Sequence, residues 1–137
     1  EETKGGALRY TQCTPRTGYG SRQVLILDTV GLLASVYGYA TWSYIGGGFG
    51  AGTHNTLDAA TFGLPVAFGP NYHKFKEARD LVTLGAARSI SNYEELQHWF
   101  IPLRDNEEFL QKTSRIAKDY TTRHQGATNI IVKTIFH

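Results

Sequence analysis

The chain has 137 residues, of which 41% are hydrophobic and 12% aromatic, which is enough apolar material for the core of one domain. Its 14 basic and 12 acidic residues give a formal charge of +2, which excludes the strong basic bias of a dedicated nucleic-acid binder. A single cysteine, Cys13, excludes an internal disulfide, and no apolar run reaches the ~20 residues of a membrane span, so the composition favours a cytoplasmic protein.

Short apolar runs bounded by glycine, proline or polar residues predict four strands, at Gln23–Leu27, Trp42–Gly46, Pro65–Phe68 and Ala87–Ser89. Helical patterns predict four helices, at Gly31–Tyr39, Asn55–Phe62, Phe75–Leu84 and Tyr93–Phe100. Ser91 and Glu94 form a capping box before the last of these helices. The alternation predicts an α/β fold, a Rossmann-like parallel sheet with helices on both faces, which binds ligands at the carboxyl ends of its strands.

The two ends of the chain are expected to differ from this central pattern. Residues 1–22 are expected to form an N-terminal loop or partial element, because turn formers fill Thr11–Ser21. Residues 23–137 are expected to form the Rossmann-like domain. From Asp105 onward the apolar spacing predicts a helical cap, with a separate segment at Thr128–Phe136 after Gly126.

The most informative stretch runs from Tyr44 to Pro70, where a glycine-rich turn joins a strand to a helix. Glycines there, including Gly47 and Gly48, allow close approach of a ligand, and bare N–H groups near a helix start attract a phosphate. Asn55 and Asp58 are expected on one face of the first helical turn, where they would orient phosphate and ribose. The alternative, of equal weight, is a plain turn in which Asn55 caps the helix and Asp58 complements its dipole.

Two further loops follow predicted strands. Leu27–Leu32 ends a strand in Asp-Thr and has room for a flat base beside Gly31, although this loop in isolation favours Asp28 or Thr29 as an ordinary helix cap. Gly69–Lys76 supplies an amide, an imidazole and two ammonium groups that could clamp an acidic sugar, or could be a solvated loop. In a doubly wound sheet these loops open on the same edge, so one ligand could touch several of them.

Other chemistries are disfavoured. The glycines do not match the dinucleotide fingerprint, and no Gly-Lys-Ser/Thr opens a helix as in a P-loop. His54 and His73 lack a third metal ligand at suitable spacing, and no nucleophile with a neighbouring base is visible.

An ordered set of motifs resembles 3-deoxy-D-manno-octulosonic acid (Kdo) transferases, over nearly the whole chain from about Leu8. The set comprises Asp28-Thr29-x-Gly31, Tyr37-Gly38-x-Ala40, Gly46-Gly47-Gly48, Gly52-x-His54-Asn55-x-Leu57-Asp58-Ala59-Ala60, Gly63-x-Pro65-Val66, Gly69-Pro70 and Asn71-x-x-x-Phe75. The likeness is to the C-terminal, donor-binding half of these enzymes, so we expect a fragment of a longer protein.

The resemblance implies a GT-B architecture in which this half binds CMP-Kdo and an N-terminal domain binds a lipid A precursor, the acceptor of Kdo. It implies that the donor nucleotide contacts seven residues, namely Val30, Gly31, Leu32, Asn55, Thr56, Leu57 and Asp58. Gly47, Gly48, His54 and Asn71 would border the phosphate or sugar. The catalytic glutamate would lie in the N-terminal domain, so the chain alone should be inactive, with no metal or cofactor besides the substrate CMP-Kdo. It further implies peripheral association with the cytoplasmic face of the bacterial inner membrane.

Three departures from the family pattern are Leu32 for glutamate, Thr56 for proline and Asp58 for glutamate. They shorten or remove individual contacts without removing the site. Pro15-Arg16 is not the family's phosphate-binding pair, because it falls in the variable loop before the Asp-Thr strand. Two alternatives stay open: a GT-B enzyme or epimerase that uses another sugar nucleotide, and a non-catalytic nucleotide-binding module.

Overall fold

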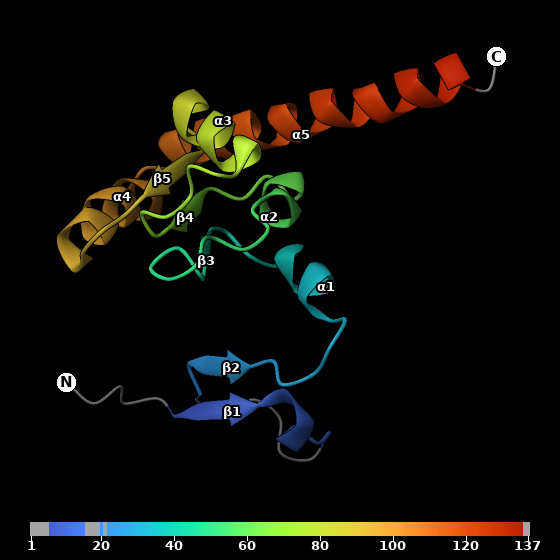
Figure 1. Ribbon diagram of the computed structural model, residues 1–137. Coiled ribbons are helices and arrows are strands. Elements are labelled where there is room, and N and C mark those ends of the chain that lie inside the picture. Colours follow the sequence, from blue (N-terminus) through green and yellow to red (C-terminus); the bar gives the residue numbers. More distant parts are fainter. Residues whose placement is uncertain (1–5, 16–19, 21, 136–137) are drawn as a thin grey trace. The chain divides into compact units, whose positions relative to one another are not determined.

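The computed structural model describes residues 6–15, 20 and 22–135, with side chains as far as residue 124. It divides into two compact units, Glu1–Val36 and Tyr37–His137, and each is described on its own (Figure 1). Both units contain parallel strands, which agrees with the α/β prediction. The strands form a two-stranded and a three-stranded sheet rather than the single sheet that the alternation predicted.

The first unit contains strand β1 (Ala7–Arg9), the 3₁₀ turn η1 (Tyr10–Gln12) and strand β2 (Val24–Ile26). β1 pairs with β2 in parallel, with Leu8 opposite Leu25. The prediction missed β1 and η1, because three-residue elements carry too little periodicity to stand out. Leu8 is the one buried hydrophobic residue of the described part of this unit, which therefore has little core of its own.

Helix α1 (Leu33–Tyr37) lies at the boundary, and the second unit continues with strands β3 (Ser43–Ile45), β4 (Val66–Phe68) and β5 (Ala87–Ser89). They form a parallel sheet in that order, with Ile45 opposite Phe68 and Phe68 opposite Ser89. All three residues of β4 are buried. A central parallel strand with both faces covered reads as a continuous apolar run, which is why its pattern predicted it well.

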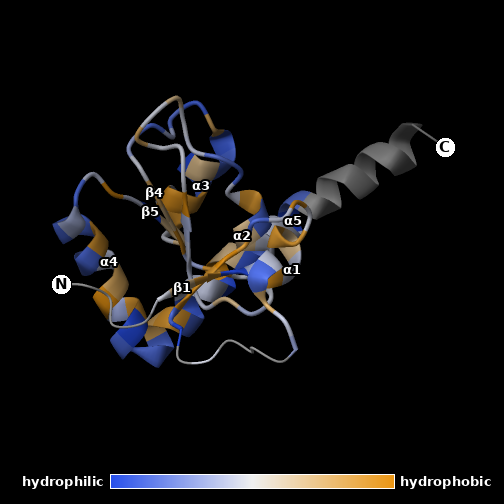
Figure 2. Cartoon of the chain, turned by 90° about the horizontal axis from the view of Figure 1, so that it is seen from below, coloured by the Kyte–Doolittle hydropathy of each residue, from blue (hydrophilic) through white to orange (hydrophobic). Residues whose placement is uncertain are grey.

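Four helices accompany this sheet: α2 (Leu57–Thr61), α3 (Lys76–Leu84), α4 (Tyr93–Asp105) and α5 (Glu107–Ile135). Buried alanines on α2, α3 and α5 let these helices approach the apolar side chains of Val66 and Phe68 closely. In Figure 2, β4 is coloured as hydrophobic, whereas α3 and α4 carry both kinds of residue. The unit has a continuous core that holds its strand ends and loops in place.

Polar contacts fasten α5 to the rest of this unit. The Tyr120 hydroxyl donates to Asp80 Oδ2 on α3 at 2.8 Å, and Lys118 Nζ donates to the carbonyl of Thr61 at the end of α2 at 2.9 Å. Hydrogen bonds from Lys76 and Tyr120 lower the pKa of Asp80, so its carboxylate stays charged and keeps accepting both.

The ends of the last helices differ from the prediction. Asn92 Oδ1 accepts from Glu95 N at 2.9 Å, and Glu95 Oε2 accepts from Ser91 N at 2.7 Å, so the cap of α4 is one residue later than the predicted Ser91 and Glu94 pair. α4 also runs past Phe100 and through Pro102. α5 is continuous through Gly126, so the separate segment predicted after it is wrong as far as Ile135, and Phe136 lies outside the described residues.

Candidate functional site

Two loops cross at the carboxyl ends of β3 and β4: the glycine loop (residues 46–54) and the proline loop (residues 69–75). Gly48 and Gly69 are in direct backbone contact, and a Cβ on Gly48 would lie 2.5 Å from Gly69 N. Real Cβ atoms do not approach backbone so closely, so both positions need glycine. The contact between the two loops therefore explains why Gly48 and Gly69 are glycines, without the need for a ligand.

Asn71 ties the two loops together through three hydrogen bonds. Its backbone N–H donates to Gly48 O at 2.8 Å, its Nδ2 donates to Gly50 O at 2.8 Å, and its carbonyl accepts from Thr53 N at 3.1 Å. The resemblance placed Asn71 beside the phosphate or sugar. The structure shows its side-chain nitrogen bonded to the glycine loop, so Asn71 positions this loop. That it also borders a phosphate or sugar stays a prediction.

The turn at Gly47 sets the shape of the glycine loop. Gly47 has a φ of 88°, and Gly50 N and Gly52 N both donate to its carbonyl, at 2.9 and 3.2 Å. A Cβ here would lie 2.3 Å from Gly52 O and 3.1 Å from the His54 ring. Only glycine meets the requirement for both a left-handed backbone and this close approach.

The start of α2 corrects one expectation about Asn55 and Asp58. The helix begins at Leu57 and has five residues, so Asn55 precedes it and the two side chains do not share its first turn. Asn55 Oδ1 accepts from Leu57 N at 2.9 Å, so Asn55 closes a turn that leads into the helix, while the N-cap residue is Thr56, which makes no side-chain capping bond. Asp58 does lie in the first turn, where a carboxylate complements the helix dipole.

A pocket of about 580 Å³ opens between the glycine loop, the start of α2 and the start of α3, and we call it the loop pocket. It is lined by Ala51, Gly52, Thr53, His54, Asn55, Thr56, Leu57, Phe75 and Glu77. Four of these residues, from His54 to Leu57, were predicted site residues. The other predicted residues of this unit, which are Gly47, Gly48, Asp58 and Asn71, are not among those that line it.

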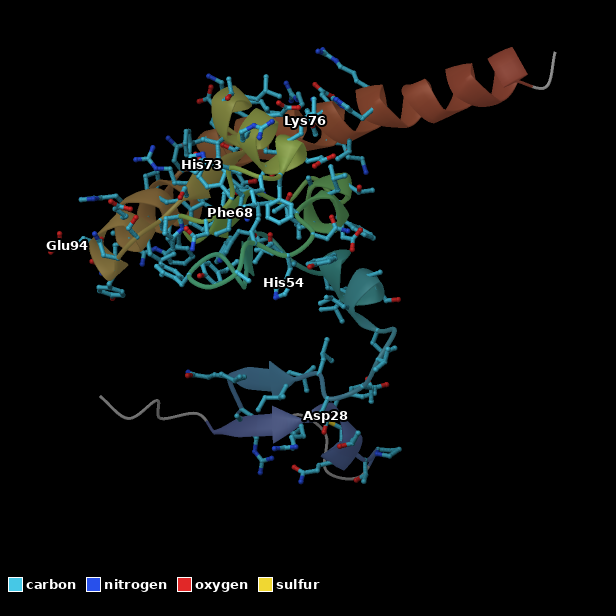
Figure 3. All side chains as sticks on the ribbon, viewed as in Figure 1. Asp28, His54, Phe68, His73, Lys76 and Glu94 are labelled. Carbon is cyan, nitrogen blue, oxygen red and sulfur yellow. The ribbon has the colours of Figure 1, made fainter. Side chains whose placement is uncertain are left out.

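Five lining residues were not predicted as site residues. Ala51, Gly52 and Thr53 lie inside the predicted stretch but were not named as site residues, and Phe75 appeared only as part of a motif. Glu77 carries no signal in the sequence, because a glutamate in the first turn of a helix is common for electrostatic reasons alone. Figure 3 shows the side chains of this unit and labels His54.

The Asp-Thr loop after β2 belongs to the first unit. Thr11 donates to the Asp28 carboxylate twice, from Oγ1 at 2.6 Å and from its backbone N at 3.1 Å. The side-chain hydrogen bond and then the backbone one lower the pKa of Asp28. Gly31 has a φ of 93°, and Val30 is fully exposed. That Val30, Gly31 and Leu32 share a ligand with residues 54–58 stays a prediction, since the two units are described separately.

The described residues hold no group of three His, Cys, Asp or Glu side chains that could bind a metal ion. Within the same residues, no helix has both the length and the apolar character that a membrane span requires.

Comparison with solved structures defines the class of the fold. The chain is similar to the C-terminal CMP-Kdo binding domain of WaaA from Acinetobacter baumannii, with a TM-score of 0.65 and 21% identity. The match covers 82% of this chain and 59% of that one. It confirms the predicted α/β fold class, which this chain shares with that domain.

Sequence comparison points to one kind of protein within this class. The chain is 34% identical over 107 residues to a 3-deoxy-D-manno-octulosonic acid transferase of Bordetella pertussis, which is 77% of this chain and 25% of that protein. It is 38% identical over 77 residues to the Rickettsia typhi protein of the same name, covering 56% of this chain and 17% of the relative. The Aquifex aeolicus protein of that name is 32% identical over 75 residues, which is 53% of this chain and 21% of the relative.

No protein-family model matches the chain. The chain spans a quarter or less of the length of these relatives. The resemblance to Kdo transferases is nevertheless confirmed: the chain is similar to part of these enzymes in sequence, and to a C-terminal domain in fold.

Proposed function

We propose that this chain is the donor-binding part of a Kdo transferase, a glycosyltransferase that moves Kdo from CMP-Kdo to a lipid A precursor in lipopolysaccharide biosynthesis. One observation carries the proposal: residues 54–57, which belong to the motif shared with Kdo transferases, also line the loop pocket. The names of the relatives and of the similar domain agree with it. The pocket lies beyond the carboxyl end of a parallel strand, where folds of this class bind nucleotides.

In this reaction an acceptor hydroxyl attacks the anomeric carbon of Kdo, and CMP leaves with negative charge on its phosphate. The part of this chain is to bind and position the donor, which makes the attack effectively intramolecular. Asn55 uses its oxygen on Leu57 N, which leaves its amide nitrogen as a donor toward the departing phosphate. Val30, Gly31 and Leu32 would hold the cytosine side.

We further propose the remaining features of the whole enzyme by the same resemblance. The general base and the lipid acceptor site would lie in an N-terminal domain outside this chain. The enzyme would work without a metal ion or prosthetic group, bound peripherally to the cytoplasmic face of the bacterial inner membrane.

An NMR titration of the isotope-labelled chain with CMP, UMP and AMP tests the nucleotide. We expect CMP to shift the amides of residues 30–32 and 52–58 selectively. Shifts with UMP or AMP but not with CMP would refute the assignment to Kdo transfer.

A pair of asparagines supplies a matched control. Asn55 and Asn92 both accept a backbone N–H at 2.9 Å next to a helix start, but only Asn55 lines the loop pocket. We expect N55A to weaken CMP binding by about tenfold, equivalent to one charge-assisted hydrogen bond, and N92A to leave it unchanged. Equal effects of the two substitutions would show that N55A acts through stability alone.

A further inference from the structure

Strand β2 has an exposed edge without charged residues. Its residues Val24, Leu25 and Ile26 are 47%, 42% and 43% exposed. β2 pairs with β1 on one side, and on its other side no described strand pairs with it. The unpaired N–H and C=O groups of this free edge, next to apolar side chains, are suited to pairing with a further strand.

The other outer strands of the described sheets are better protected against such pairing. β1 and β5 each carry an exposed arginine, which is Arg9 in β1 and Arg88 in β5. β3 exposes only Tyr44 of its three residues. A charged side chain on an edge strand opposes pairing with another chain, and β2 lacks this protection.

The first unit is poorly stabilised by its own contacts. Leu8 is the one buried hydrophobic residue among its described residues. An isolated two-stranded sheet is at best marginally stable in water, whereas three or more strands with an apolar face can be stable. Two copies joined along β2 would form one four-stranded sheet, in which the apolar side chains of both β2 strands are neighbours. The first unit therefore gains stability from a partner that supplies strands.

The residues around β2 are complementary to a second copy of themselves. In antiparallel pairing of two copies centred on Leu25, Val24 lies opposite Ile26, and continued pairing places Arg22 opposite Asp28. Arg22 and Asp28 are both exposed, and Arg22 forms no ion pair with a described residue. Opposite charges directly across two strands stabilise the pairing, and this register forms the pair twice in a symmetric dimer. A shift of the register removes the match.

We propose that the free edge of β2 binds a second copy of this chain, whose β2 pairs antiparallel to it about a two-fold axis at Leu25. The interface is self-complementary, as in the common two-fold dimers. Backbone hydrogen bonds between the two β2 strands hold it together, and the Arg22–Asp28 pairs set its register. The proposal concerns the first unit alone and does not depend on the proposed function.

The mass of the 137-residue chain in solution is the first test. Light scattering after size-exclusion chromatography should give twice the 15.2 kDa of one copy, with dissociation on dilution. R22E puts a carboxylate opposite Asp28 of the second copy, so we expect the dimer to dissociate at least about tenfold more easily. R88E changes the charge of an exposed strand residue outside the interface and should leave the dimer unchanged. Far-UV circular dichroism checks that each variant is folded.

Charge exchange tests the pairing itself. D28R alone should weaken the dimer, because two arginines then face each other. The double substitution R22E/D28R restores opposite charges, so its dimer should be tighter than that of either single variant. A double variant no tighter than the weaker single variant would overturn the proposed register.

Crosslinking in a C13S background locates the axis. Two copies of residue 25 lie directly opposite each other, with Cα atoms about 4.5–5.5 Å apart, which a disulfide can bridge. Two copies of residue 24 are about 7 Å out of step along the strands, beyond the reach of a disulfide. We expect L25C, oxidised with glutathione disulfide, to give covalent dimers on a denaturing gel, and V24C to give few.

Three results would each overturn the inference. A wild type that stays monomeric up to about 1 mM would show that the edge stays open or is bound by a different partner. A dimer that R88E weakens as much as R22E would show a general effect of charge. Crosslinking of V24C as fast as that of L25C would place the contact between copies elsewhere.

Discussion

The two loops that follow β2 and β3 carry similar signals in the sequence but are held in different ways. The glycine loop crosses another loop backbone to backbone, and Asn71 fastens it with three hydrogen bonds. The Asp-Thr loop is held at Asp28 by Thr11, and Val30 beyond it is fully exposed. Glycine clusters can therefore mark the places where a chain packs against itself, even when they lie beside a pocket.

The difference has a consequence for how each loop would bind a ligand. The glycine loop is packed before any ligand arrives, so its pocket has a defined shape and its ligand does not have to order it. Gly31 has a positive φ, but no atom lies within 4 Å of where a Cβ would be. A larger residue at this position would therefore meet backbone strain but no steric clash. Substitutions should hence be more damaging in the glycine loop.

The largest effect is expected for G48A. An alanine Cβ at this position would lie 2.5 Å from Gly69 N, and the contact is with backbone, which cannot rotate away. We expect the free energy of unfolding to fall by about 3 kcal/mol or more. Urea denaturation followed by the fluorescence of Trp42 and Trp99 measures it.

Gly50 provides the matched control for G48A in the same loop. A Cβ there would lie 3.7 Å from its nearest neighbour, Gly47 O, which is ordinary van der Waals contact, and the residue has no positive φ. G50A should change the free energy of unfolding by less than about 1 kcal/mol. Equal stabilities of G48A and G50A would show that the loops do not cross as described.

A smaller effect, with a distinctive pH dependence, is expected for N71D. The aspartate would place a carboxylate against Gly50 O, which now accepts from Asn71 Nδ2 at 2.8 Å. Repulsion of the charged form raises the pKa of this aspartate in the folded state. The variant is then most stable below the unfolded pKa, where the protonated carboxyl can donate, and loses about 1 kcal/mol as pH rises through the folded pKa.

Thermal midpoints of N71D at mildly acidic and at neutral pH, each relative to the wild type, measure this dependence. N71A is its control, because it lacks the donor at every pH and should show a constant deficit. A deficit of N71D that does not shrink in acid would mean that the Asn71 amide does not hold the glycine loop.

The smallest effect concerns the Asp-Thr loop. Thr11 lowers the pKa of Asp28, so the stabilising contribution of this carboxylate is present above its unfolded pKa and is lost as pH falls through the folded pKa. T11V removes the side-chain hydrogen bond and should return the pKa of Asp28 toward its usual value. The carboxyl resonance of Asp28, followed by NMR against pH, measures this pKa in T11V and in the wild type. Equal pKa values of Asp28 in the two proteins would show that Thr11 and Asp28 do not interact.

The local pattern of the sequence determined most of the helices and strands of this protein. The sequence alone predicted β5 at its observed ends and β2, β3, β4, α1, α2 and α3 to within two residues. A buried parallel strand shows as a short continuous apolar run and an amphipathic helix as a 3.6-residue period, so both can be found from local pattern. The alternation of these elements defined the α/β class, and the motif residues from His54 to Leu57 were recognised before their pocket was known.

Tertiary structure decided what depends on contacts between distant residues. Gly48 meets Gly69, and Thr53 shares a pocket with Glu77, only because the ends of β3 and β4 lie side by side. Whether the Asn71 amide faces a ligand or the glycine loop is likewise set by this crossing. Periodicity along a chain reports which face of an element is buried, whereas the partner of a loop residue depends on how the elements pack in space.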